Sequence, residues 1–206
     1  MAAIINEINE NKKYNIITIE DPIEFVYKNK SSIIQQREIG THTNNFQTAL
    51  KSALRESCDV ILVGEMRDPE TIQLALTAAE TGHLVISTLH TSGAAKTIDR
   101  IIDSFETNKQ NQIRNQISES LRTVIWQQLL PSIDGKSRVA ALEIMNKNEA
   151  IGNLIRKNKT FQIASVIETN VQKGMVSMKK SIENHLATGF ISSDVAEKYI
   201  QGLGLN

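Results

Sequence analysis

Two kinds of hydrophobic pattern alternate along the first two thirds of the chain. Short apolar runs rich in β-branched residues predict strands at residues 15–19, 33–38, 58–63, 84–87 and 138–144. Between the second and third runs, one apolar stripe recurs at helical spacing, formed by Phe46, Ala49, Leu50, Ala53 and Leu54. Strands that alternate with amphipathic helices predict an α/β fold, in which helices cover a mainly parallel sheet.

Capping residues indicate where two of the predicted helices begin and end. Asp68 is a favourable N-cap, Pro69 fits the first helical position, and Gly82 follows the last turn of the same helix. For the preceding helix, Thr43 or Asn44 is the expected N-cap. These signals place one helix directly after the third predicted strand.

Periodicity predicts two longer amphipathic helices, at residues 1–15 and 108–129, the second with Trp126 near its end as a packing residue. Asp134-Gly135 is typical of a tight turn and leads into the last predicted strand. Beyond this strand the strand signals stop.

Short helices with polar faces are predicted in the last quarter of the chain, at residues 149–157, 161–169, 177–188 and 193–200. We therefore expect an α/β core at residues 1–145 and a small helical C-terminal subdomain at residues 146–206. The sequence contains no internal repeat, and no low-complexity linker lies between the two parts.

Composition limits the classes of protein to consider. The chain has 206 residues, and its 23 lysines and arginines balance 23 aspartates and glutamates. A net charge of zero provides no overall attraction to nucleic acid or to an anionic membrane, so no nucleic-acid partner is expected. A single cysteine, Cys58, excludes an internal disulfide. Because no apolar run approaches the ~20 residues of a membrane span, we expect a soluble protein in a reducing cytosol.

Three polar segments adjoin the predicted strands. The first is Ile-Glu-Asp-Pro-Ile-Glu at residues 19–24, and the second is Val-Gly-Glu-Met-Arg-Asp at residues 63–68. The third, residues 81–91, begins Thr-Gly-His and ends Thr-Leu-His-Thr, with a strand between its histidines. Taken singly, each has an ordinary structural explanation: a solvated turn, a buried parallel strand that leads into a capped helix, and structural imidazoles.

Together the segments favour a shared site. Ligands of open parallel sheets bind outside the carboxyl ends of the strands, where we expect all three segments to converge. The second segment is typical of a Walker B strand, whose acids lie near nucleotide-bound Mg²⁺. Phosphoryl transfer to water needs a carboxylate to orient the water, an acid to manage Mg²⁺, and donors near the γ-phosphate. The segments supply each of these groups.

The order and spacing of the three segments resemble the Asp box, Walker B motif and His box of the type II and type IV secretion and pilus ATPases. Within that superfamily, the amino-acid sequence of residues 78–83 and 94–100 is most similar to that of the PilT-type twitching-motility ATPases, which power pilus retraction. The resemblance extends through nearly the whole chain. It implies a RecA-like fold, ATP and Mg²⁺ as cofactors, and a homo-hexameric ring with nucleotide between subunits. It also implies a cytoplasmic location at the inner-membrane pilus machine, with the membrane platform protein as a partner.

The resemblance also implies roles for individual residues. Catalytic roles fall to Glu20, Asp21, Glu24, Glu65, His83 and His90. Glu24 matches the catalytic glutamate, although the residues themselves do not choose between Glu20 and Glu24 as the general base. Nucleotide contacts fall to Glu65, Thr88 and Arg67, and Glu65 manages Mg²⁺ directly or through water. For Arg67 a structural ion pair is an equally good explanation.

Two features depart from the family pattern. No segment fits the phosphate-binding loop G-x-x-x-x-G-K-[ST], because the triplet Gly135-Lys136-Ser137 lacks the first glycine and lies in the predicted turn. Residues 1–11 resemble the helix that follows such a loop, so we expect a truncated form that does not hydrolyse ATP at a useful rate alone. Gly152 replaces the first arginine of an A-I-R-N-L-I-R element that the retraction ATPases share. Plain packing of an amphipathic helix explains this segment equally well; if the element couples ATP turnover to retraction, we expect weaker coupling here.

The sequence bears on three other classes of protein. Extension and secretion ATPases of the superfamily usually contain a four-cysteine zinc element, which one cysteine cannot form. A non-catalytic paralogue without the phosphate loop, acting as a regulatory or structural subunit of the ring, stays open. A metal hydrolase is disfavoured, because His83 and His90 are seven residues apart with a strand between them.

Overall fold

The structure is a computed structural model that describes residues 1–203. Its contacts divide the chain into two compact units: Met1–His90 with Ser104–Glu106, and Thr91–Asp103 with the residues from Thr107 onward. The boundary expected between residues 145 and 146 lies inside the second unit and stays a prediction. No helix in the described part of the chain has both the length and the apolar character needed to cross a membrane.

The first unit contains the predicted parallel sheet. Its strand order is β2-β1-β3-β4, and every neighbouring pair is parallel. The bounds are Asn15–Glu20 for β1, Ile33–Glu38 for β2, Val60–Val63 for β3 and Leu84–Ser87 for β4. Four of the predicted strands are thus confirmed, and only β3 begins two residues later than expected, at Val60.

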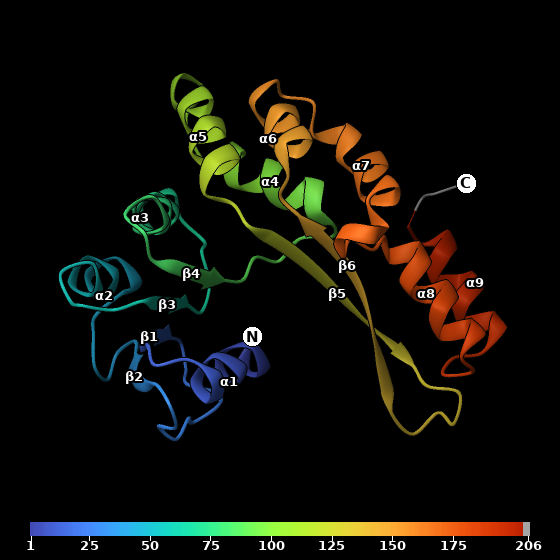
Figure 1. Ribbon diagram of the computed structural model, residues 1–206, viewed down its shortest axis with the longest axis horizontal. Helices are drawn as coiled ribbons and strands as arrows, with labels where there is room; N and C mark the ends of the chain where they lie inside the picture. Colours follow the sequence, from blue (N-terminus) through green and yellow to red (C-terminus); the bar gives the residue numbers. More distant parts are fainter. Residues whose placement is uncertain (204–206) are drawn as a thin grey trace. The chain divides into compact units, whose positions relative to one another are not determined.

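Helices cover both faces of this sheet, as Figure 1 shows. The bounds are Ala2–Asn11 for α1, Phe46–Ala53 for α2 and Pro69–Glu80 for α3. Successive residues of a strand point to opposite faces, so Ile17 and Ile19 pack with α2 and α3, whereas Ile16 packs with Ile5 of α1. Because both faces are covered, residues 16–19 of β1 are fully buried.

The caps agree with the sequence in one helix and differ in the other. Asp68 caps α3 by accepting from the Thr71 N–H at 2.9 Å, with Pro69 in the first turn. Asn45, rather than Thr43 or Asn44, caps α2, so that prediction was wrong by one or two positions. Asn45 has the extended backbone that an N-cap requires, and its side chain accepts from the Thr48 N–H at 2.8 Å.

The second unit combines helices with a two-stranded antiparallel sheet (Figure 1). Its main elements are α4 (Ala94–Asp103), α5 (Thr107–Ser120), β5 (Thr123–Pro131), β6 (Arg138–Asn146), α6 (Glu149–Arg156), α7 (Ile163–Thr169), α8 (Met178–Ala187) and α9 (Ser193–Gln201), with 3-10 turns at Thr160–Gln162 and Val171–Lys173. Leu130 and Ala141 of the hairpin pack against Met178 and Ile182 of α8 and Ala196 of α9. The predicted C-terminal helices are therefore confirmed.

The long helix predicted at residues 108–129 is wrong beyond Ser120. From Thr123 the chain is β5, which pairs with β6 through Leu129 opposite Ala140 and Trp126 opposite Glu143. The residues that begin this strand, Thr-Val-Ile-Trp, are β-branched or aromatic, and their exposure alternates with the period of two that a half-buried strand requires. Trp126 still packs against a hydrophobic cluster, but from a strand.

Gly64, directly after β3, allows the ends of β1 and β3 to approach closely. Its N–H donates to the Ile19 carbonyl at 2.7 Å. A Cβ at this position would lie 3.2 Å from that carbonyl oxygen and 3.4 Å from the Glu20 Cα. Both neighbours are backbone atoms and cannot rotate away, so any larger residue must push the strand ends apart.

We expect Gly64→Ala to lower the free energy of unfolding by about 1–3 kcal/mol, as overpacking against fixed backbone usually does. Chemical denaturation followed by circular dichroism measures this change. Gly152→Ala in α6 is the matched control, because its Cβ would meet its nearest neighbour, the Ser118 carbonyl, at an ordinary 3.4 Å. This variant should be neutral or gain up to about 1 kcal/mol in helix propensity. Equal stability of the two variants would contradict the close approach at Gly64.

Candidate functional site

The register of the sheet brings two of the predicted polar segments and the end of the third to one edge. Ile19 of β1 lies opposite Val63 of β3, and Val63 lies opposite Ser87 of β4. The residues that follow, Glu20, Gly64 and Thr88, therefore leave the sheet in one row at its carboxyl edge. Ligands of parallel sheets bind at this edge.

Thr88 holds the loop after β3 in place. Its hydroxyl donates to the Gly64 carbonyl at 2.6 Å, and its own carbonyl accepts from the Met66 N–H at 3.3 Å. Glu65 lies between these two contacts. The residues on either side of Glu65, Gly64 and Met66, are thus both hydrogen-bonded to Thr88, which fixes the position of the Glu65 backbone.

Both carboxylate oxygens of Glu65 contact a basic side chain. Arg67 Nη2 lies 2.6 Å from Oε2, and His90 Nε2 lies 3.3 Å from Oε1. The hydrogen bond and charge of Arg67 hold the pKa of Glu65 below its ordinary value, although partial burial opposes this. Glu65 in turn raises the pKa of Arg67, and the charge of Asp21 adds to that effect. Asp21, Glu65, Arg67 and His90 therefore form one electrostatic group.

Glu20 and Glu24 lie in different surroundings. The Glu20 carboxylate accepts from the Thr18 hydroxyl at 2.6 Å and from Gln36 Nε2 at 3.2 Å. Burial of Tyr27 raises the pKa of that residue, and the charge of Glu20 adds to the rise. Glu24 is exposed, and none of the described residues donates a hydrogen bond to its carboxylate. Glu24 can accept a proton from a water molecule without first breaking a bond within the chain.

His83 does not join this edge, contrary to the convergence that the sequence predicted. It precedes β4, at the amino end of the strand, whereas His90 follows the carboxyl end. Its Nδ1 lies 3.0 Å from the Ala78 carbonyl and 3.2 Å from the Thr81 hydroxyl, where α3 ends. The strand between the two histidines, four residues long, itself spans roughly 13 Å.

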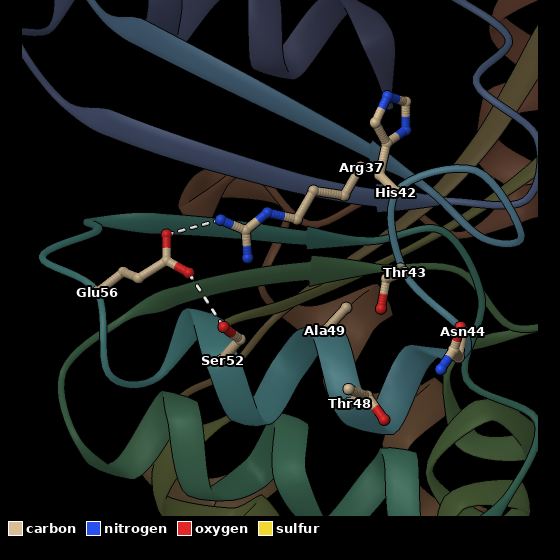
Figure 2. Close-up of a pocket in the computed structure, with 8 residues that line it drawn as sticks. All are labelled: Arg37, His42, Thr43, Asn44, Thr48, Ala49, Ser52 and Glu56. Atoms are coloured by element: carbon tan, nitrogen blue, oxygen red, sulfur yellow. Dashed lines mark hydrogen bonds and ion pairs between the residues drawn. The ribbon is translucent and has the colours of Figure 1, made fainter.

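A cavity of about 410 Å³ lies elsewhere in the first unit, and Figure 2 shows the residues that line it. They come from β2, α2 and the segments that follow each of them. Its main charged groups neutralise each other, since Arg37 Nη2 pairs with Glu56 at 2.6 Å. None of the residues predicted for the site lines this cavity.

Two residues that no motif marks, Gln36 and Glu38, have side chains that contact the segment containing Glu24. Gln36 donates to the Phe25 carbonyl at 2.8 Å, and Glu38 accepts from the Ile23 N–H at 2.9 Å. The available signal was two polar residues at alternate positions near the carboxyl end of a predicted strand. Such residues share one face of a strand.

Among the described residues, no group of three or more His, Cys, Asp or Glu side chains is arranged to hold a metal ion. Mg²⁺ bound with a nucleotide usually needs only one or two carboxylates, because phosphates and waters complete its shell. Glu65, ionised and fixed at the carboxyl edge, fits that requirement. The cationic Arg67 and the imidazole of His90 beside it fit an anionic ligand.

Comparison with known protein families identifies the group to which this chain is related. A family model described as type II/IV secretion system protein matches residues 1–186. The chain belongs to the type II/IV secretion system protein family. The resemblance to its PilT-type members, inferred above from the three boxes, is confirmed by individual relatives.

Two curated relatives cover nearly the whole chain. The twitching motility protein of Neisseria gonorrhoeae is 55% identical over 201 residues, which are 98% of this chain and 54% of that protein. The type IV pilus retractation ATPase PilT of Pseudomonas aeruginosa is 50% identical over 198 residues, which are 96% of this chain and 57% of that protein. The chain thus spans little more than half the length of these relatives.

Solved structures of the family agree with the fold. The crystal structure of the pilus retraction motor PilT with bound ADP matches with a TM-score of 0.88 and 49% identity, over 96% of this chain and 55% of that one. The Legionella pneumophila ATPase DotB matches with a TM-score of 0.87 and 36% identity, over 98% of this chain and 56% of that one. The α/β, RecA-like fold class is confirmed.

We expect Arg67→Ala to raise the pKa of Glu65 toward its ordinary value, because Arg67 is the main cause of the lowering. A group with a lowered pKa stabilises the fold above its ordinary pKa, and that contribution is lost as the pH falls through the lowered value. NMR titration of the Glu65 carboxyl carbon measures the change. Lys51→Ala, which breaks a separate exposed ion pair with Glu70, is the control. An unchanged Glu65 pKa in Arg67→Ala would contradict the pairing.

Proposed function

We propose that this chain is the catalytic part of a motor ATPase subunit that hydrolyses ATP to drive type IV pilus retraction. The observation that supports this most strongly is the carboxyl edge of the sheet, where Glu65 is fixed beside Arg67 and His90. Glu24, in the segment that Glu38 binds at Ile23, is exposed and unpaired among the described residues. The names of the relatives support the motor and its output. The share of their length that the chain spans makes the activity of the whole protein part of the proposal.

Glu24 is assigned as the general base that removes a proton from the attacking water. We prefer it to Glu20 because Thr18 and Gln36 already donate to the Glu20 carboxylate, which leaves that residue a structural task. Glu24 directly follows Ile23, whose N–H is bound by Glu38 at the carboxyl end of β2, and its carboxylate has no hydrogen-bond partner among the described residues. Asp21 contributes negative charge beside Arg67.

Glu65 is assigned to Mg²⁺, directly or through a water molecule, and Thr88 and Arg67 to the nucleotide side of the site. When bound with ATP, Mg²⁺ neutralises charge on the phosphates and orients them. Arg67 and His90 hold Glu65 ionised and in place before the ligand arrives. Of the two histidines of the His box, we assign contact with the phosphates to His90, because His83 contacts the end of α3 instead.

The assembly that we propose is a homo-hexameric ring. A platform protein attaches this ring to the cytoplasmic face of the inner membrane. The exposed side chains of Glu24, Arg67 and His90 fit a site that a neighbouring subunit completes. The 206 residues contain no G-x-x-x-x-G-K-[ST] loop, so turnover is proposed for a polypeptide in which such a loop precedes them.

The test uses a polypeptide extended at its N-terminus by a family N-terminal domain and phosphate-binding loop. There Glu24→Gln should reduce the rate of ATP hydrolysis by on the order of 100-fold or more, because it removes the base but keeps the shape. ATP affinity, measured by titration calorimetry, should stay unchanged.

Glu7→Gln, an exposed carboxylate change on α1, is the control and should retain full turnover. Unaltered hydrolysis in Glu24→Gln would assign the base to another residue. A failure of the extended polypeptide to bind ATP at all would favour the non-catalytic regulatory or structural subunit.

A further inference from the structure

The segment between β1 and β2 contains Glu24 but forms no helix or strand. Its backbone is instead bound by side chains of β2. The parallel register makes this possible, since Thr18 lies opposite Gln36 and Glu20 lies opposite Glu38. The chain leaves β1 at Glu20 and passes over the same two side chains before it enters β2.

Gln36 makes three hydrogen bonds to this region. Its Nε2 donates to the Phe25 carbonyl at 2.8 Å and to Glu20 Oε1 at 3.2 Å, and its Oε1 accepts from the Tyr27 N–H at 2.9 Å. An amide is the side chain that can donate twice and accept at once, so neither a carboxylate nor an apolar residue can replace it.

Glu38 binds the other end of the segment. Its Oε2 accepts from the Ile23 N–H at 2.9 Å, and its Oε1 accepts from the Thr41 hydroxyl at 3.0 Å. The Ile23 N–H lowers the pKa of Glu38, which is therefore ionised at neutral pH. Gln36 and Glu38 are two residues apart on one strand, so they share a face.

We propose that Gln36 and Glu38 are positioning residues, which hold the backbone on both sides of Glu24 and so aim its carboxylate. The proposal rests on the assignment of Glu24 as the general base. Because no described residue donates to the Glu24 carboxylate, the place of that side chain depends on its backbone, bound at Ile23 before it and at Phe25 and Tyr27 after it. A general base works only within hydrogen-bond reach of the proton it removes, and small misplacements cost rate steeply.

The first experiment measures amide hydrogen exchange by NMR in the 206-residue chain without ligand. Gln36→Met should speed exchange at Tyr27, and Glu38→Ala should speed it at Ile23, each by roughly 2- to 10-fold, the worth of one ordinary hydrogen bond. Amides of Ile17 and Val63 in the buried strands should be unaffected, which shows that the variants are folded.

Two variants sharpen the comparison. Gln35→Met changes the neighbouring glutamine, which is exposed and points to the other face of β2, and it should leave Ile23 and Tyr27 unchanged. Glu38→Gln keeps an acceptor for the Ile23 N–H and should restore most of its protection. Unchanged exchange in both Gln36→Met and Glu38→Ala would overturn the proposal.

The second experiment measures hydrolysis in the extended polypeptide described above. Gln36→Met and Glu38→Ala should lower kcat on the order of tenfold or more and leave KM unchanged, because they move the base but not the nucleotide. Faster exchange with unchanged kcat, while Glu24→Gln is inactive, would overturn the positioning role but not the proposed function. Full activity of Glu24→Gln would instead overturn the assignment of the base on which the proposal rests.

Discussion

The parallel pairing of β1 with β2 and β3 is the constraint on which the candidate site depends. Opposed residues in this register leave the sheet together, so Glu20, Glu38, Gly64 and Thr88 emerge at one edge. The short contact between Gly64 and the Ile19 carbonyl keeps the two central strands close at that edge. A slip of one residue would turn each side chain to the opposite face and separate the acids from one another.

The acids at this edge differ in what they are free to do. Glu65 is already held by Arg67 and His90, and Glu20 by Thr18 and Gln36, whereas Glu24 has no such partner. Neighbouring carboxylates with different partners can take different roles in one reaction. The structure therefore separates a group that manages charge from a group that is able to move a proton.

Much of this fold follows from local patterns in the sequence. The apolar runs of β1 and β4 and the Asp68-Pro69 start of α3 depend on near neighbours only, and the sequence predicted them well. β5 depends on pairing with β6. Residues 121–129 also fit the apolar spacing of a helix, so periodicity alone predicted a helix where the structure has a strand. Tertiary pairing decided between two acceptable local structures.

The same distinction explains what was missed in the site. Glu65 and Glu24 stand in recognisable motifs, but the contacts of Gln36 with Phe25 and Tyr27 depend on register, which no local pattern specifies. His83 was expected at the edge because it shares a box with His90. The direction of β4 places the two at opposite ends of one strand, a consequence of strand geometry that motif spacing does not express.

The place where nucleotide binds tests most directly whether the carboxyl edge of the sheet is the functional site. Hydrogen-exchange footprinting of the extended polypeptide, with Mg²⁺ and a non-hydrolysable ATP analogue, compares peptides along the chain with and without ligand. We predict slower exchange in residues 20–27, 64–67 and 88–90, at the carboxyl edge of the sheet. Protection confined to residues 37–56, around the cavity that Arg37 and Glu56 line, would contradict it.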